Sequence, residues 1–447
     1  MTIARVFVAN RGEIAVRIVR ACRALGLEAV VGVSDVDRDG AAARLADRAV
    51  CIGPARASES YLKPETIVQA ALGTGCDAIH PGYGFLSENP RLAALAREEG
   101  LRFVGPPAEV IELAGDKLRA RTKAAEAGLP LVPGGEVATL DAARRFAGES
   151  GYPVLLKAAG GGGGRGIKLA HDPDELAALF GVAVAEAESA FGDPRLYVER
   201  FVAAARHVEV QIAADGHGAV VHLGERDCSV QRRYQKVIEE APAPSITPRQ
   251  REALTGAAVA FARAIGYVNL GTVEFMVDAR TGEFFFLECN CRIQVEHPVT
   301  EEVTGRDLVA EQLRIAAGEP LSFAREDVVL DGHAVEARLT AEDVAHDFRP
   351  SPGRLSRFAV PDVENLRVDT HCSEGTLIPP YYDSLMAKLI GRGPDRASAI
   401  GVLSEALERL EVEGVQTNRT LLRDVLAHDD FATGAVTTRW LEEEALA

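Results

Sequence analysis

Residues 271–301 read GTVEFMVDARTGEFFFLECNCRIQVEHPVTE, and in this stretch acidic residues interrupt strand-forming sequence. Two runs rich in aromatic and β-branched residues, 272–277 and 284–287, flank a turn that contains glycine, which is typical of an antiparallel hairpin. Each strand carries one carboxylate, Glu274 or Glu288. Because two buried carboxylates on adjacent strands repel each other unless a divalent cation lies between them, the stretch predicts a metal site.

After Glu288, polar residues occupy every second position: Asn290, Arg292, Gln294 and Glu296. In an extended chain, alternate side chains share one face. Alternation alone also fits an edge strand with a solvated face. The chemistry of the row favours a functional site over a solvated face. An acid and an amide are suitable ligands for a hard cation, a guanidinium binds an oxyanion, and a second acid can act as a base.

Composition limits the class of protein. The length of 447 residues predicts about two to four domains. A hydrophobic share of 47% is typical of a soluble globular protein, and a net charge of −17 argues against nucleic acid or an anionic membrane as the main partner. The seven cysteines are scattered, and Cys289-x-Cys291 has no matching second pair, so we expect reduced cytoplasmic thiols and no zinc site. Neither a signal peptide nor a membrane-spanning run is expected.

The N-terminal residues predict a Rossmann-like opening. An apolar run at 4–9 leads through Asn10-Arg11-Gly12-Glu13 into an amphipathic helix over 14–25 and a strand over 28–34. The glycine fingerprint of dinucleotide-binding domains is missing, so an NAD-dependent dehydrogenase is not favoured. Further on, the loop HPGYGFLSEN at 80–89 fits a binding loop or a structural turn equally well.

A glycine-rich segment lies between two predicted strands. Lys157 ends the strand 152–157, five glycines occupy 160–164, and a second strand covers 167–170. A flexible linker is the alternative, but the arrangement favours a flap over phosphates, because bare backbone N–H groups can approach phosphate oxygens. The sequence is not that of a P-loop, and the glycine-rich flap of kinases is the better comparison.

The segment ERDCSVQRRYQK at 225–236 is densely charged for an acidic protein. The segment contains four cationic residues, Arg226, Arg232, Arg233 and Lys236. Their positive charges could balance the negative charge of phosphate or bicarbonate. A solvated loop of ion pairs is the alternative. The preceding run 207–212 alternates polar and apolar residues, which fits a strand beside a nucleotide or an ordinary half-exposed strand.

Several motifs together resemble the biotin carboxylases, the ATP-grasp components of acetyl-CoA, propionyl-CoA and pyruvate carboxylases. They run in family order from residue 4 to about residue 419 and are ANRGE, HPGYGFLSEN, Lys157 with GGGGGRG, ERDCSVQRR, QKVIEEAPAP, GTVEF, ECNCRIQVEHPVTE and PPYYDSLMAKLI. The resemblance implies an α/β fold with an α+β centre. It implies a Rossmann-like N-terminal domain at 1–113, an ATP-grasp domain at 114–330 with a mobile lid at about 133–202, and a C-terminal biotin carboxylase domain at 331–447.

The resemblance also implies a function: ATP- and bicarbonate-dependent carboxylation of biotin at N1′ through carboxyphosphate, as the first half-reaction of an acyl-CoA carboxylase such as acetyl-CoA carboxylase. The biotin would be carried by a biotin carboxyl carrier protein, and the product would pass to a carboxyltransferase. A cytoplasmic homodimer without a nucleic-acid or membrane partner is implied.

The resemblance assigns roles to individual residues. ATP contacts are implied for Lys117, Lys157, Gly163, Gly164, Glu199, Arg200, Phe201, Val202, His207, Gln231, Tyr234, Glu274 and Glu288. Two Mg²⁺ or Mn²⁺ ions would be held by Glu274, Glu288 and Asn290. Bicarbonate would be bound by Lys236, Arg292, Gln294 and the backbone of Val295. Glu296 would be the base, and Arg338 would stabilise the biotin enolate. These two residues form the implied catalytic set together with Lys236 and Arg292. Near the ureido ring we expect Tyr83 and Glu88.

Three positions depart from the family pattern. Tyr234 replaces a common His beside the nucleotide, and this change leaves the affinity for ATP open. Arg200 replaces a Lys that is common in the hinge. Cys291 replaces a Thr, and by alternation this position faces away from the site. No Ala-Met-Lys-Met biotinylation motif is present, so the biotin is expected on another chain or domain.

Two other functions fit the sequence less well. Arg338 and the loop at 80–89 argue against a different ATP-grasp ligase, such as a carbamoyl-phosphate or amino-acid ligase. The complete set of metal and base residues argues against a non-catalytic nucleotide-binding regulator. The sequence leaves open which acceptor is finally carboxylated, and whether the chain is a free subunit or the front of a longer one.

Overall fold

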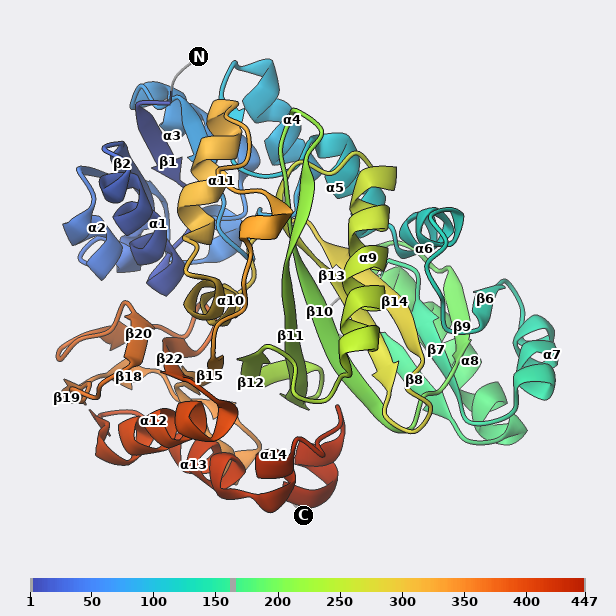
Figure 1. Cartoon of the computed structure of the whole chain (residues 1–447). Coiled ribbons are helices and arrows are strands. Elements are labelled where there is room, and N and C mark those ends of the chain that lie inside the picture. The colour runs from blue at the N-terminus through green and yellow to red at the C-terminus, as the bar shows by residue number, and fades with distance from the viewer. Residues whose placement is uncertain (1–2, 161–165, 446–447) are drawn as a thin grey trace.

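The computed structural model describes residues 3–160 and 166–445, and its parts surround one long central sheet (Figure 1). The N-terminal part contains a five-stranded parallel sheet in the order β3-β2-β1-β4-β5. Its strands are β1 (Arg5–Val8), β2 (Glu28–Ser34), β3 (Arg48–Gly53), β4 (Ala78–His80) and β5 (Arg102–Phe103). Its helices are α1 (Gly12–Ala24), α2 (Ala41–Leu45), α3 (Pro64–Gly73), α4 (Pro90–Glu98) and α5 (Ala108–Gly115). The predicted Rossmann-like opening is confirmed.

The strand order reverses beside β1, so the loops after β1 and β4 meet at one edge of this sheet. Asn10 joins them, because its Nδ2 donates hydrogen bonds to the carbonyl oxygens of Pro81 (2.6 Å) and Tyr83 (2.7 Å). The motif ANRGE and the loop at 80–89 therefore form one structural unit, which presents Tyr83 to the rest of the molecule.

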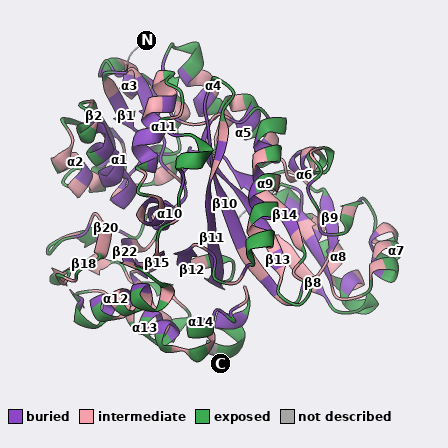
Figure 2. Cartoon of the chain, viewed as in Figure 1, coloured by how far each residue is buried: buried purple, intermediate pink, exposed green. Residues whose placement is uncertain are grey.

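The central sheet has eight strands in the order β14-β13-β10-β11-β12-β15-β22-β20. They are β10 (Ala205–Ala214), β11 (Val220–Arg232), β12 (Gln235–Ala241), β13 (Asn269–Asp278), β14 (Phe284–Asn290), β15 (His333–Thr340), β20 (Leu366–Thr370) and β22 (Leu385–Gly393). The predicted hairpin is confirmed as β13 and β14, and Glu274 lies directly opposite Glu288. Figure 2 shows β10 and β11 buried along most of their length.

Helices from two parts of the chain pack around this sheet. They are α9 (Pro248–Ala264), α10 (His297–Thr304), α11 (Leu308–Ala317), α12 (Arg396–Arg409), α13 (Arg419–Ala427) and α14 (Asp429–Thr433). Helix α9 packs on β11 and β10, and its Phe261 ring lies against Phe286 of β14 within one apolar cluster. Short two-stranded ladders complete the C-terminal part, namely β16 (Glu342–Asp343) with β17 (Arg349–Pro350), β18 (Gly353–Arg354) with β21 (Leu377–Ile378), and β19 (Arg357–Ala359) with β23 (Glu411–Glu413).

A small sheet beside β13 and β14 has its own apolar core (Figure 1). Its order is β6-β9-β7-β8, with β6 (Gly134–Val137), β7 (Val154–Ala158), β8 (Ile167–Ala170), β9 (Leu196–Arg200), α7 (Leu140–Ser150) and α8 (Pro173–Phe191). The helix α6 (Lys117–Glu126) precedes it. The small sheet with α7 and α8 occupies the range predicted for the lid, and the mobility of the lid stays a prediction. Gly163 and Gly164 lie outside the described residues.

The structure excludes one alternative that the sequence left open and corrects one expectation. The segment at 225–236 is not a solvated loop, because most of it is the buried strand β11 and the start of β12. The polar row after Glu288 is not extended throughout, because β14 ends at Asn290 and the chain turns toward α10. The row still sorts its side chains as alternation predicts, since Cys291 and Ile293 pack in apolar clusters. None of the described helices is both long and apolar enough to cross a lipid bilayer.

Candidate active site

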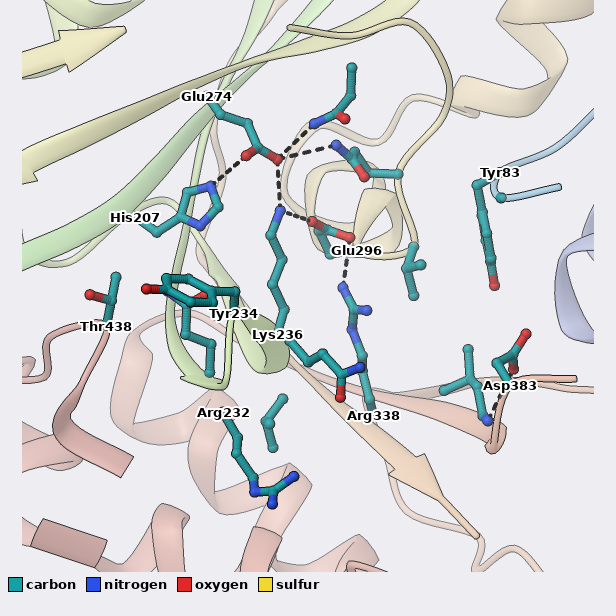
Figure 3. Close-up of a pocket in the computed structure, with 18 of the residues that line it drawn as sticks. Tyr83, His207, Arg232, Tyr234, Lys236, Glu274, Glu296, Arg338, Asp383 and Thr438 are labelled. Carbon is teal, nitrogen blue, oxygen red and sulfur yellow. Dashed lines mark hydrogen bonds and ion pairs between the residues drawn. The ribbon is translucent and has the colours of Figure 1, made fainter. Parts of the chain in front are cut away.

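A cavity of about 1340 Å³ lies between the small sheet, the central sheet and the C-terminal part. Sixteen of the predicted site residues line it: Tyr83, Lys117, Lys157, Glu199, His207, Gln231, Tyr234, Lys236, Glu274, Glu288, Asn290, Arg292, Gln294, Val295, Glu296 and Arg338. Figure 3 shows part of this set, with Lys236 between Glu274 and Glu296 and Arg338 beside Glu296. Residues from distant parts of the sequence therefore share one cavity.

Four predicted residues do not line this cavity. Glu88 supports Arg292 instead, because its Oε2 accepts a hydrogen bond from Arg292 Nε at 2.9 Å. Val202 is buried, Arg200 lies over the Phe285 ring at 5.7 Å, and Phe201 lies beneath Arg439. Their side chains contact protein, so the nucleotide contacts predicted at these three positions would have to come from the backbone.

Lys236 connects three acids of the site. Its Nζ donates hydrogen bonds to Glu209 (2.6 Å), Glu274 (3.0 Å) and Glu296 (2.7 Å). Burial favours the neutral amine, but the Cys228 sulfur and these carboxylates outweigh it, and the pKa of Lys236 lies well above its ordinary value. The site therefore holds a fixed positive charge among its acids.

Glu274 and Glu288 face each other across the hairpin. Burial opposes ionisation of Glu274, but Lys236 and His207 outweigh it, and its pKa lies well below the ordinary value. Burial and the charge of Glu274 raise the pKa of Glu288. Asn290 adds an amide, whose Nδ2 donates to Glu274 at 2.8 Å. Two facing carboxylates and an amide oxygen are ligands that Mg²⁺ and Mn²⁺ prefer, so the residues present fit the predicted metal site.

A second group of potential ligand atoms comes from His207, Glu209 and Glu274, which lie within 4.8 Å of one another. Lys236 Nζ already contacts both of these carboxylates. The ammonium group supplies the positive charge there, so we assign no metal to this group.

Glu296 is fully buried between two cations. Its Oε1 accepts a hydrogen bond from Lys236 Nζ and its Oε2 accepts one from an Arg338 guanidinium nitrogen at 2.9 Å. Burial and the nearby Glu209 oppose ionisation, but Lys236, Arg338 and Arg226 outweigh them, and the pKa of Glu296 is lowered. An ionised carboxylate at this place can accept a proton from a bound substrate.

Arg292 presents its guanidinium to the cavity in a fixed orientation. Besides Glu88, it donates to Gln294 Oε1 at 2.6 Å and to Asn290 Oδ1 at 3.3 Å. A guanidinium held on three sides is preorganised for a small oxyanion such as bicarbonate.

Comparison with known proteins agrees with this geometry. The model of the biotin carboxylase N-terminal domain matches residues 2–111, that of the carbamoyl-phosphate synthase L chain ATP-binding domain matches 116–324, and that of the biotin carboxylase C-terminal domain matches 336–443. The biotin carboxylase of Nostoc sp. is 48% identical over 98% of both chains. The chain belongs to the biotin carboxylase family. The prediction of an ATP-dependent biotin carboxylase with an ATP-grasp centre is confirmed.

Two solved structures of the biotin carboxylase family are similar along their whole length. The biotin carboxylase–βγ-ATP complex from Campylobacter jejuni is 41% identical with a TM-score of 0.96, and the alignment covers 99% of each chain. The biotin carboxylase domain dimer of Hydrogenobacter thermophilus 2-oxoglutarate carboxylase, in complex with MgADP, ADP and bicarbonate, is 46% identical with a TM-score of 0.95 and covers 100% of this chain and 98% of that one.

Sequence reasoning did not identify Glu209 as part of the site, and it left the role of Arg226 open. Arg226 is completely buried, and its guanidinium donates to Glu209 (2.6 Å), Gln211 (2.8 Å) and Thr300 (2.9 Å). It thereby holds Glu209 against Lys236. The signal was present as an acid in an alternating strand and an Arg in a charged segment, but only the pairing of β10 with β11 brings the two together.

Replacing Arg226 with Met is expected to destabilise the protein strongly, by about 3–5 kcal/mol, because Glu209 would lose one of its two cations inside the core. The check is the midpoint of thermal unfolding, which should fall well below that of the natural protein. Arg97→Met is the matched control, because Arg97 pairs with Glu109 on the surface and its loss should change the midpoint little. Equal midpoints for the two variants would contradict the structural role of Arg226.

Proposed function

We propose that the chain carboxylates biotin carried by another chain or domain, using ATP and bicarbonate, as the first half-reaction of an acyl-CoA carboxylase such as acetyl-CoA carboxylase. The observation that carries the proposal is the position of Glu296, a buried carboxylate hydrogen-bonded to both Lys236 and Arg338. This position supports the role of Glu296 as the base between the predicted bicarbonate cradle and the predicted biotin site.

In the first step, the Glu296 carboxylate takes the proton of bicarbonate, and the resulting oxyanion attacks the γ-phosphorus of ATP. The bond between the γ-phosphorus and the oxygen bridging to ADP breaks, which gives carboxyphosphate and ADP. Arg292 and Lys236 orient the anion and balance its charge, together with Gln294 and the backbone of Val295. Metal ions held by Glu274, Glu288 and Asn290 would, when bound, neutralise charge on the phosphates.

In the second step, carboxyphosphate breaks into CO₂ and phosphate. The phosphate takes the N1′ proton of biotin, and N1′ then forms its new bond to the carbon of CO₂. Arg338 stabilises the enolate oxygen of the ureido ring through a charge-assisted hydrogen bond. Tyr83 lines the same cavity, which supports its place near the ring, and Glu88 acts through Arg292.

The nucleotide is proposed to bind between the small sheet and the central sheet. Lys117 and Lys157 face the cavity, and Lys157 forms an ion pair with Glu199 that the phosphates would replace. Tyr234 lies half-exposed on the turn between β11 and β12, where Arg233 and Tyr234 have positive φ (46° and 66°). His207 and Gln231 line the cavity nearby.

We also propose the domain division 1–113, 114–330 and 331–447. The matched ranges of the three family models support these boundaries. The central sheet continues from β12 to β15, so the second and third parts share it. A homodimer, a biotin carboxyl carrier protein and a carboxyltransferase are the proposed partners, and the dimer in the Hydrogenobacter thermophilus structure supports the first. A cytoplasmic location stays a prediction, since relatives from plants are named chloroplastic.

The test is ADP release by the purified chain with ATP and Mg²⁺, measured with and without bicarbonate and free biotin. We expect release that needs bicarbonate, rises with biotin, and stops when EDTA removes the metal. Turnover that is indifferent to biotin would favour another ATP-grasp ligase. ATP binding without turnover under any of these conditions would favour a regulator and contradict the proposal.

A further inference from the structure

A lysine outside the predicted site is buried next to it. Lys388 lies on β22, directly opposite Arg338 of β15 and Asp369 of β20, and its side chain is 0% exposed. Its Nζ donates a hydrogen bond to the carbonyl oxygen of Val295 at 2.8 Å. Glu13 Oε1 lies 3.2 Å from the same nitrogen and Asp369 Oδ2 lies at 3.8 Å.

Glu13 extends this contact to the N-terminal part. It belongs to α1, and the atom that faces Lys388, Oε1, also accepts a hydrogen bond from the Tyr83 hydroxyl. A continuous chain of contacts thus runs from Tyr83 through Glu13 and Lys388 to the Val295 carbonyl. Both ends of this chain line the large cavity, whereas Glu13 and Lys388 do not.

The segment that holds Val295 depends on such contacts for its position. It follows the end of β14 and pairs with none of the described strands, so no ladder of backbone hydrogen bonds to them fixes it. Glu88 accepts the N–H of Cys291 at 2.9 Å near its start, and Lys388 binds the carbonyl of Val295 near its end.

Charge balance alone does not explain where Lys388 points. A buried ammonium is costly unless it is paired, and Glu13 and Asp369 already supply two carboxylates. Burial opposes the charge, but Glu13, Glu336 and Asp369 outweigh it and raise the pKa of Lys388. The shortest contact of the charged amine nonetheless goes to a neutral backbone carbonyl in the site.

We propose that Lys388 is a positioning residue that fixes Val295, and with it the backbone that cradles bicarbonate, and that Glu13 ties this position to Tyr83. The inference rests on the proposed function, because it deepens the role given there to the Val295 backbone. It assigns to Lys388 an effect on bicarbonate binding and none on nucleotide binding.

The test compares Lys388→Met with the double variant Lys388→Met/Glu13→Gln in bicarbonate-dependent ADP release. Both are expected to raise the KM for bicarbonate about tenfold, the loss of about 1.4 kcal/mol of binding, while the KM for ATP is unchanged. The double variant contains no unpaired charge at position 13, and Arg367 still pairs with Asp369 at 2.9 Å, so it should fold even where the single variant does not. Lys123→Met is the control, because Lys123 is only partly buried on α6 and pairs with Glu126 at the surface.

A purely structural role for Lys388 predicts another result. The double variant would then recover the KM for bicarbonate of the natural protein, because the change Glu13→Gln would remove the carboxylate nearest to the lost ammonium. That recovery, or equal increases in the KM for ATP and for bicarbonate, would overturn the inference. Failure of the proposed function is distinct, because the unsubstituted protein would then show no bicarbonate-dependent ADP release.

Discussion

Glu296→Gln is expected to lower bicarbonate-dependent ADP release by about 10²–10⁴-fold, the contribution typical of a positioned general base. Glutamine keeps the size of the side chain, and its oxygen can still accept a hydrogen bond from Lys236 or Arg338. It cannot accept the proton of bicarbonate. The loss should therefore appear in kcat, while the thermal midpoint and the KM for ATP stay close to those of the natural protein.

The pH dependence gives a second measurement for Glu296. Because a base must be ionised and the pKa of Glu296 lies below its ordinary value, activity should persist as the pH falls and decline only when the pH approaches that lowered pKa. In Glu296→Gln this acidic decline should be missing from the residual activity. The control is Glu283→Gln, an exposed acid in the turn between β13 and β14. Full activity in Glu296→Gln would exclude Glu296 as the base.

Arg338→Met is expected to lower carboxybiotin formation by about 10²–10³-fold, as does the loss of one oxyanion donor in other enzymes. Arg338 acts on the biotin enolate in the proposed mechanism, so bicarbonate-dependent ADP release without biotin should be affected much less. The two activities are measured on one preparation, with ¹⁴C-bicarbonate for carboxybiotin and a coupled assay for ADP.

The electrostatic consequence of this substitution has a definite sign. Arg338 lowers the pKa of Glu296, so its removal should raise that pKa and move the acidic decline of the biotin-independent activity to higher pH. Arg392→Met is the control, because Arg392 lies on the same strand as Lys388 and pairs with the exposed Asp331. Equal losses in both activities would show that Arg338 serves the first step and not the enolate.

Local sequence predicted those parts of the site that lie close together along the chain. The hairpin at 272–287 followed from aromatic and β-branched runs around a glycine turn, and its register indeed places Glu274 opposite Glu288. The row from Asn290 to Glu296 presents its side chains to the cavity as alternation predicts, although the chain leaves the sheet after Asn290. Family motifs extended this to residues that the bare pattern leaves undecided, such as Lys117.

The sequence by itself determined the order of the elements, the hairpin and the chemistry of the polar row, because these depend on contacts between near neighbours and on side-chain periodicity. Only the tertiary structure decided that Lys236 contacts Glu209, Glu274 and Glu296 at once, and that Arg226 is buried against Glu209. The tertiary structure alone also shows that Lys388, the lone lysine of the apolar run LMAKLI, contacts Val295 and Glu13. The physical reason is that these contacts join strands and helices far apart in the chain, and their register is set by the packing of whole sheets and not by any local pattern.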